Sequence, residues 1–98
     1  MIMMTSEYIE KKLKEIKPYL IDEFHVSRIG YFGSFAMNNQ TENSDIDIFV
    51  EFSQTPGWEF FTLEEYLERI FNRKIDLVTK AALKEQLKNV ILKQVKYI

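Results

Sequence analysis

Two aspartates separated by one residue, Asp45 and Asp47, stand at the start of a strongly apolar run. Side chains of a β-strand alternate between its two faces, so we expect both carboxylates on the same side of one strand. Neighbouring carboxylates repel each other unless a cation lies between them, which predicts a divalent metal site. A Gly-Ser pair, Gly33 and Ser34, ends the preceding apolar run and predicts a tight turn that can hold an anion. A metal beside such a turn indicates triphosphate chemistry.

A third aspartate, Asp76, lies in the short apolar run 74–78. The segment between 46 and 78 reads as strand, helix and strand, which fits a right-handed crossover between parallel neighbours. Such a crossover would place Asp76 beside Asp45 and Asp47. Taken singly, each of these residues has an ordinary explanation as a surface strand position or a simple turn. Their order along the chain favours a shared site.

Nucleotidyl transfer is the chemistry that this set suits. A hydroxyl attacks the α-phosphate of a nucleoside triphosphate, and pyrophosphate leaves; two cations about 3.5–4 Å apart stabilise the attacking and leaving oxygens. We expect Asp45, Asp47 and Asp76 to bind two Mg²⁺ ions, with Asp76 also helping to deprotonate the nucleophile. Gly33 and Ser34 are expected to hold the β- and γ-phosphates at the start of a short helix over 34–37, where a Cβ at position 33 would obstruct close approach.

The remaining pattern predicts helices around three strands. A helix capped by Thr5 or Ser6 carries an apolar stripe that ends at Phe24, and Pro18 predicts a kink or the start of a second short helix. Strands are predicted over 29–32, Ile46–Phe52 and 74–78, and a helix between the last two ends at Asn72. A closing helix is expected to present one apolar face. That face comprises Leu83, Leu87, Val90, Ile91 and Val95.

Composition bounds the class of protein. With 98 residues, 46% of them hydrophobic, the chain is expected to form one domain over 1–98. The sequence contains no cysteine, and we find no signal peptide and no membrane-spanning run, which predicts a cytoplasmic protein without a membrane partner. A net charge of −2, with an acidic segment over 42–68, argues against direct binding to nucleic acid.

These motifs together resemble a known family. The residues Gly33-Ser34-Phe35-Ala36, Ser44-Asp45-Ile46-Asp47 and Ile75-Asp76-Leu77-Val78 are similar to the motifs of DNA polymerase β-type nucleotidyltransferases. Within that superfamily the chain more closely resembles the minimal nucleotidyltransferase (MNT) antitoxins of HEPN–MNT toxin–antitoxin pairs. The resemblance implies an α/β (α+β) fold with a small mixed β-sheet flanked by helices. It also implies Mg²⁺ with ATP, and transfer of AMP to a tyrosine of the HEPN RNase toxin, with Gly33 and Ser34 in the phosphate role and the three aspartates in the metal role.

One position departs from the resembled motif, which usually continues Ala-Arg-Gly where this chain has Ala36-Met37-Asn38. The departure leaves open an alternative, a weakly active or inactive module that neutralises a toxin by binding it. Transfer to RNA or a small molecule is a further alternative, disfavoured because no part of the chain remains to form an acceptor-holding domain. The acceptor surface is therefore expected to belong to a partner protein, in a possible hetero-oligomer.

Three other residues have ordinary interpretations. His25 is expected to be a solvated residue at a helix end. Trp58 is expected to pack over the first turn of the helix that follows it, and Tyr97 to be a frayed terminal residue.

Overall fold

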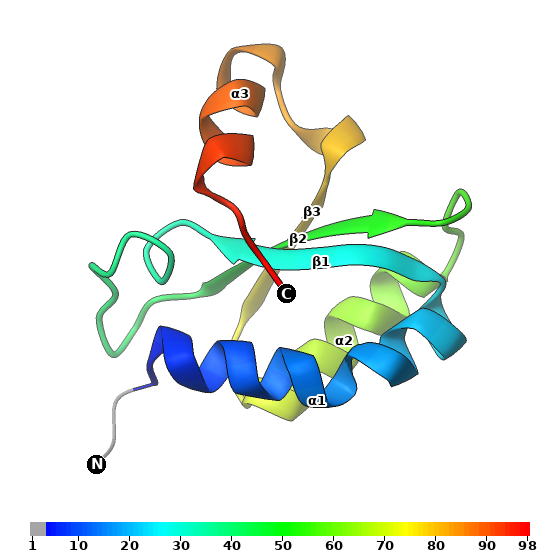
Figure 1. The fold of residues 1–98 in the computed structure, drawn as a ribbon, viewed down its shortest axis with the longest axis horizontal. Coiled ribbons are helices and arrows are strands. Elements are labelled where there is room, and N and C mark those ends of the chain that lie inside the picture. Colours follow the sequence, from blue (N-terminus) through cyan, green and yellow to red (C-terminus); the bar gives the residue numbers. More distant parts are fainter. Residues whose placement is uncertain (1–3) are drawn as a thin grey trace.

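A mixed four-stranded sheet separates two layers of helices in the computed structural model, which describes residues 4–98. Helices α1 and α2 cover one face of the sheet, and α3 stands on the other (Figure 1). The strand order is β3-β2-β1-β4, with β2 and β3 parallel and the other neighbours antiparallel. The elements are α1 (Ser6–Phe24), β1 (Val26–Phe32), β2 (Ile46–Phe52), α2 (Glu59–Phe71), β3 (Ile75–Thr79), the 3₁₀ helix η1 (Lys80–Ala82), α3 (Glu85–Gln94) and β4 (Lys96–Tyr97).

Strand β2 is central and follows the predicted alternation. Ile46, Ile48 and Val50 are fully buried in the main core, which lies between the sheet and the helices α1 and α2. Phe49 points to the opposite face and packs in a smaller cluster with Phe32 and Val95. The face that carries Asp47 is therefore the one on which α3 stands, because Asp47 and Phe49 lie two residues apart.

The predicted fold class and the parallel crossover from β2 through α2 to β3 are both confirmed. The bounds of β2 are as predicted, whereas β3 lies one residue later than expected and β1 begins three residues earlier. Of the two alternatives at Pro18, the start of a second short helix is wrong, since α1 is one helix from Ser6 to Phe24 with Pro18 inside it. Thr5 caps it by accepting a hydrogen bond from the Tyr8 amide at 3.2 Å.

The C-terminal segment differs most from prediction. Leu83 and Val95 lie outside α3, and α3 has no buried residue. After α3 the chain returns to the sheet as β4, which lies antiparallel to β1 and pairs Tyr97 with Gly30 (Figure 1). A Cβ on Gly30 would lie 2.6 Å from the Lys96 carbonyl oxygen, so only glycine permits this approach. The prediction that Tyr97 is frayed is therefore wrong. Tyr97 pairs with Gly30, and Arg28 Cζ lies 3.9 Å from the centre of its ring.

No helix within residues 4–98 is both long and apolar enough to cross a membrane. The predicted absence of a signal peptide rests partly on residues 1–3, which lie outside the described residues.

Candidate active site

Two of the three predicted aspartates face each other on adjacent parallel strands. Asp47 of β2 is in register with Asp76 of β3, so both side chains project from the α3 face of the sheet. Their neighbours Ile46, Ile75 and Leu77 point the other way, into the main core. Asp47 is half-buried and Asp76 is exposed. The alternation of side chains along each strand thus brings the two carboxylates together near the N-terminal ends of β2 and β3.

Gly33 lies directly against Asp47. It follows the end of β1, whose last residue, Phe32, is in register with Asp47. A Cβ on Gly33 would stand 2.0 Å from Asp47 Oδ2, and the backbone there has a φ of +71°, which L side chains rarely adopt. The absent side chain of Gly33 makes room for the Asp47 carboxylate, and its predicted contact with phosphate stays a prediction.

The surroundings of Asp47 disfavour its charged form. Burial is the largest cause, followed by the charge of Asp76, a hydrogen bond with Asp76 and the charge of Asp45; together they raise the pKa of Asp47 from 3.8 to about 6. Nearby positive charge would reverse this effect. A carboxylate pair held at such an electrostatic cost is typical of a site that binds a cation.

Asp45 joins this pair less closely than predicted. It is exposed immediately before β2 and acts on Asp47 through its charge. Within residues 4–98, no three or more Asp, Glu, His or Cys side chains converge in a group that could hold a metal ion. Two carboxylates with a third nearby nonetheless fit Mg²⁺, which binds few protein carboxylates and takes its other ligands from phosphate and water.

The Gly33–Ser34 segment forms a turn and not the predicted helix over 34–37. The Met37 amide donates to the Gly33 carbonyl and the Asn39 amide to the Ser34 carbonyl, both at 3.0 Å. A helix N-terminus is therefore not available to phosphate, and any anion must be held by the backbone of the turn itself. Met37, at the position where the resembled motif has arginine, is 58% exposed.

A basic segment that sequence reasoning missed contacts the loop before β2. Arg73 donates a hydrogen bond of 2.8 Å from Nη1 to the Ser44 carbonyl, and its guanidinium lies 5.7 Å from the centre of the Phe35 ring. The next residue, Lys74, accepts a hydrogen bond of 3.1 Å from the Ile46 amide. The position of these residues just before the parallel partner of β2 was the available signal.

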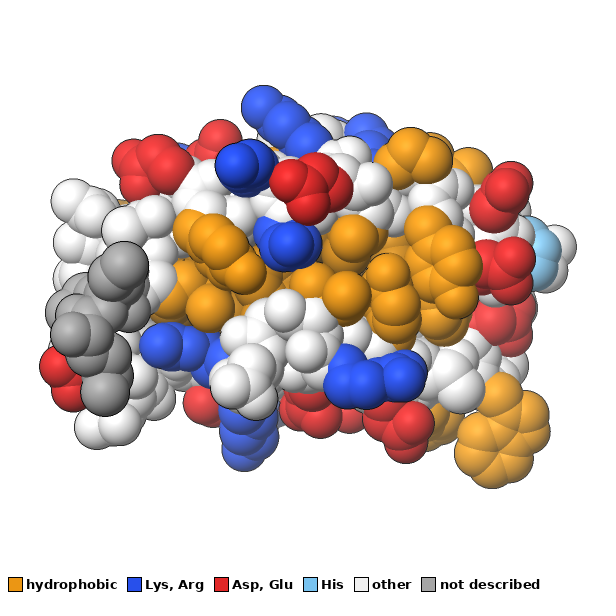
Figure 2. Space-filling model, turned by 90° about the horizontal axis from the view of Figure 1, so that it is seen from below, with side chains coloured by type: hydrophobic (Ala, Val, Ile, Leu, Met, Phe, Trp, Pro, Cys, Tyr) orange, Lys and Arg blue, Asp and Glu red, His pale blue; other side chains and the backbone are white. Residues whose placement is uncertain are grey.

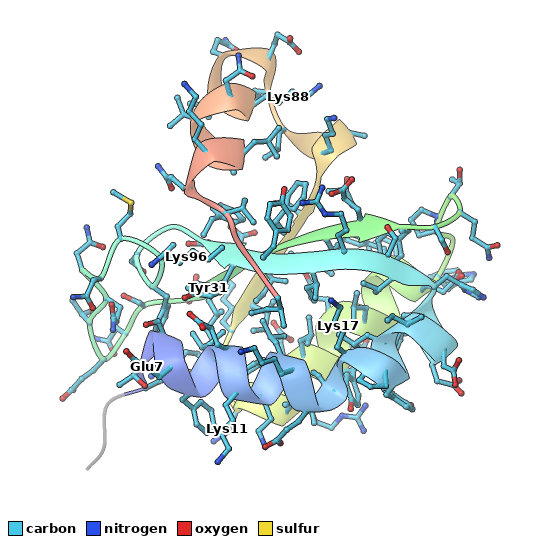
Figure 3. All side chains as sticks on the ribbon, viewed as in Figure 1. Glu7, Lys11, Lys17, Tyr31, Lys88 and Lys96 are labelled. Carbon is cyan, nitrogen blue, oxygen red and sulfur yellow. The ribbon has the colours of Figure 1, made fainter. Side chains whose placement is uncertain are left out.

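Several other polar residues lie away from this site. Figure 3 shows Tyr31 on the α1 side of the sheet, where its hydroxyl donates to the Glu10 carboxylate. Burial, reinforced by Glu10, raises the pKa of Tyr31 to about 12. His25 ends α1 with its Nδ1 3.3 Å from a Glu59 carboxylate oxygen. Trp58 does not pack over α2 as predicted, since it is 81% exposed.

Known proteins are similar to this chain in sequence and in fold. Residues 14–98 match the family model of "Polymerase beta, Nucleotidyltransferase". The protein adenylyltransferase MntA of Thermococcus cleftensis is 40% identical over 99 residues, covering all of both chains. A protein of Methanocaldococcus jannaschii assigned as a protein adenylyltransferase is 47% identical over 83 residues, covering 84% of this chain and 85% of the relative.

Solved structures extend the likeness to three dimensions. A structure assigned as a minimal nucleotidyltransferase superposes with a TM-score of 0.80 at 23% identity, covering 95% of each chain, which supports the fold. A toxin–antitoxin structure with AMP-PNP superposes with a TM-score of 0.67 at 26% identity, covering 96% of this chain and 72% of the other. A further toxin–antitoxin structure, at 24% identity with a TM-score of 0.58, contains an MNT antitoxin with a tri-AMPylated HEPN toxin of Shewanella oneidensis.

Proposed function

This chain belongs to the polymerase β nucleotidyltransferase family, and we propose that it is a protein adenylyltransferase that acts as the antitoxin of a HEPN-class RNase. In this proposal it transfers AMP from ATP to a tyrosine hydroxyl of the toxin. The adenylyltransferase relatives support the reaction type, and the toxin–antitoxin structures with AMP-PNP and with an AMPylated toxin support the nucleotide and the partner.

The observation that carries the proposal is the pairing of Asp47 with Asp76 against Gly33. The pair lies in register on parallel strands, and the backbone of a glycine turn closes against one carboxylate. A surface strand pair with no function would be expected to separate its charges or to pair them with lysine or arginine. Among residues 4–98, the ion pairs involve neither Asp47 nor Asp76.

The reaction assigns a task to each residue. Asp47 and Asp76, with Asp45, would hold Mg²⁺, which when bound with ATP would offset the negative charge of the phosphates. The tyrosine oxygen forms a bond to the α-phosphorus, and the bond from that phosphorus to the bridging oxygen of the β-phosphate breaks, so that pyrophosphate leaves. Asp76, the exposed member of the pair, would accept the phenolic proton. The turn over 33–38 would orient the departing phosphates.

Transfer of label is the direct test. Purified protein is incubated with Mg²⁺, a HEPN-class toxin from the same genome and ATP labelled at the α-phosphate. We expect a labelled toxin band and release of pyrophosphate, whereas ATP labelled at the γ-phosphate should leave the toxin unlabelled. Omission of Mg²⁺ should abolish labelling. An unlabelled toxin, under conditions in which a related antitoxin labels its own toxin, would contradict the proposed activity.

Neutralisation by contact is a second candidate, and exposed apolar side chains favour it. Trp58 is 81% and Phe61 is 56% exposed, and their rings lie 6.1 Å apart at the start of α2. Figure 2 shows a further band of hydrophobic side chains along the face formed by α1 and α2. Such surfaces are typical of proteins that bind another protein. Contact and catalysis are compatible, because a protein acceptor must be held while its tyrosine reacts.

A further inference from the structure

We propose that Arg73 is a positioning residue for the transfer reaction, holding the loop that carries Asp45 against the segment that leads into Asp76. The inference rests on the proposed function for its catalytic consequence. Its structural content depends on contacts of the lead into β3 with two consecutive parts of the β1–β2 connection, from which it is distant in sequence. These two parts are the turn after β1 and the loop before β2.

The backbone on both sides of Asp45 is bound to consecutive residues of the α2–β3 connection. Arg73 Nη1 donates to the carbonyl of Ser44, the residue before Asp45, at 2.8 Å. The amide of Ile46, the residue after Asp45, donates to the Lys74 carbonyl at 3.1 Å. Asp76 follows two residues after Lys74. The distance between Asp45 and the Asp47–Asp76 pair is therefore fixed through the segment 73–74.

Arg73 also reaches the glycine turn. Its guanidinium lies 5.7 Å from the centre of the Phe35 ring, within the range of a cation–π contact. Phe35 is 1% exposed and directly follows Ser34, so it anchors the turn to the core. One planar side chain thus contacts both the segment proposed to hold phosphate and the segment that carries Asp45.

Arg73 gives the loop before β2 an external contact at Ser44, where the hydrogen bonds between Thr41 and Ser44 close the loop upon itself. The Thr41 amide donates to Ser44 Oγ at 2.8 Å, and the Ser44 amide donates to the Thr41 carbonyl at 3.1 Å. These bonds fix the internal shape of the loop but not its orientation on the sheet. Arg73 forms no ion pair among residues 4–98, so its contribution is this backbone contact and not the pairing of a surface charge.

Three variants separate positioning from general stability. Arg73→Gln removes the guanidinium and Arg73→Lys restores a donor without its planar shape. Arg69→Gln is the control, because Arg69 is an exposed arginine in the last turn of α2. For each we would measure kcat and KM for toxin labelling, the thermal midpoint, and hydrogen exchange of the Ile46 amide.

We expect Arg73→Gln to lower kcat about tenfold or more, to exchange the Ile46 amide faster and to keep a thermal midpoint close to that of Arg69→Gln. Arg73→Lys should recover part of kcat. An unchanged kcat and unchanged exchange in Arg73→Gln would overturn the inference, as would a loss of kcat explained entirely by a lower thermal midpoint. If the wild-type protein labels no toxin, the proposed function fails, while hydrogen exchange still decides whether Arg73 holds the loop.

Discussion

Asp47 occupies a position that its own charge disfavours. It is half-buried, it faces Asp76 across the strand pair, and the Gly33 backbone approaches it where any side chain would clash. Burial and the neighbouring Asp76 charge both disfavour the ionised carboxylate when no cation is bound. Their coincidence at one residue fits a site in which stability is sacrificed for function.

We predict that Asp47→Asn stabilises the metal-free protein at neutral pH. The folded-state pKa of Asp47 is raised from 3.8 to about 6, so the folded state binds a proton more tightly than the unfolded state does. Ionisation of Asp47 therefore lowers the free energy of unfolding as pH rises through this window, and the loss is complete only well above the folded-state pKa of about 6. Because solvent screens the site partly, we expect a gain of about 1–2 kcal/mol in the variant at pH 7.

The pH dependence distinguishes this effect from a general benefit of asparagine. The advantage of Asp47→Asn should vanish below pH 3.8, where the wild-type carboxyl is protonated in both states. Asp22→Asn, at an exposed position of α1, should give no comparable gain. Denaturant unfolding from pH 3 to 8 with EDTA present measures both. A variant less stable than wild type at pH 7 would refute the argument.

We predict that Gly33→Ala reduces transfer far more than it reduces stability. The substitution forces a Cβ into a backbone with a φ of +71° and towards Asp47 Oδ2, so the carboxylate must move. The conformational strain costs about 1–2 kcal/mol, whereas displacement of a reacting group by 1 Å costs about 100-fold in rate. Gly57→Ala is the matched control, because its Cβ would meet only Glu59 Oε1, at 3.6 Å. Equal labelling by Gly33→Ala and Gly57→Ala would show that the close packing is not needed.

At the scale of elements, local pattern determined what could be predicted. Strand β2 was predicted with its bounds because apolar residues occupy every second position from Ile46 to Phe52, and the crossover rule placed the strand of Asp76 beside it. The closing helix was predicted too long because apolar spacing continues from Leu83 to Val95. Val95 instead packs with Phe32 and Phe49 on the sheet. That contact joins residues far apart in sequence, and no local signal reveals it.

Strand β4 depends on a single glycine in its neighbour. We predict that Gly30→Ala detaches the C-terminal strand, because the added Cβ would stand 2.6 Å from the Lys96 carbonyl oxygen and 2.8 Å from Val95 Cγ1. The hydrogen bond from the Ile98 amide to the Ile29 carbonyl should then be lost. Faster hydrogen exchange at Ile98, with β2 still protected, is the expected result. Protection at Ile98 equal to that of Gly57→Ala would contradict this account.

At the scale of the whole molecule, the arrangement leaves the site at an open edge. The described residues extend over 38 × 32 × 19 Å; α1 and α2 cover the face opposite Asp47, and α3 stands on the face that carries it. Asp45 and Asp76 are both exposed. Apolar side chains are exposed at the start of α2 and on α3, and a partner protein that supplies the acceptor would find apolar surface there; they are Trp58, Phe61, Leu87 and Val90.

Transfer of AMP to the toxin and binding of the toxin can be tested separately by a variant that removes the aspartate charges but keeps the size of the side chains. We predict that Asp45→Asn with Asp47→Asn abolishes toxin labelling and leaves the toxin RNase active, while the toxin still copurifies with the variant. Both side chains keep their size, and the fold loses a charge repulsion, so unfolding cannot explain the loss. The measurements are RNA cleavage by the toxin and the mass of the complex on size exclusion, each with wild type and variant.

A non-transferable nucleotide gives the matched control with the wild-type chain. Replacing ATP by an analogue with a methylene between the α- and β-phosphates leaves the protein chain unchanged but blocks release of pyrophosphate. If transfer silences the toxin, RNA cleavage should persist with this analogue as it does with the double variant. If contact alone silences the toxin, both conditions should suppress cleavage as fully as wild type with ATP. Suppression in both would assign the exposed apolar surface, and not the aspartate pair, as the source of neutralisation.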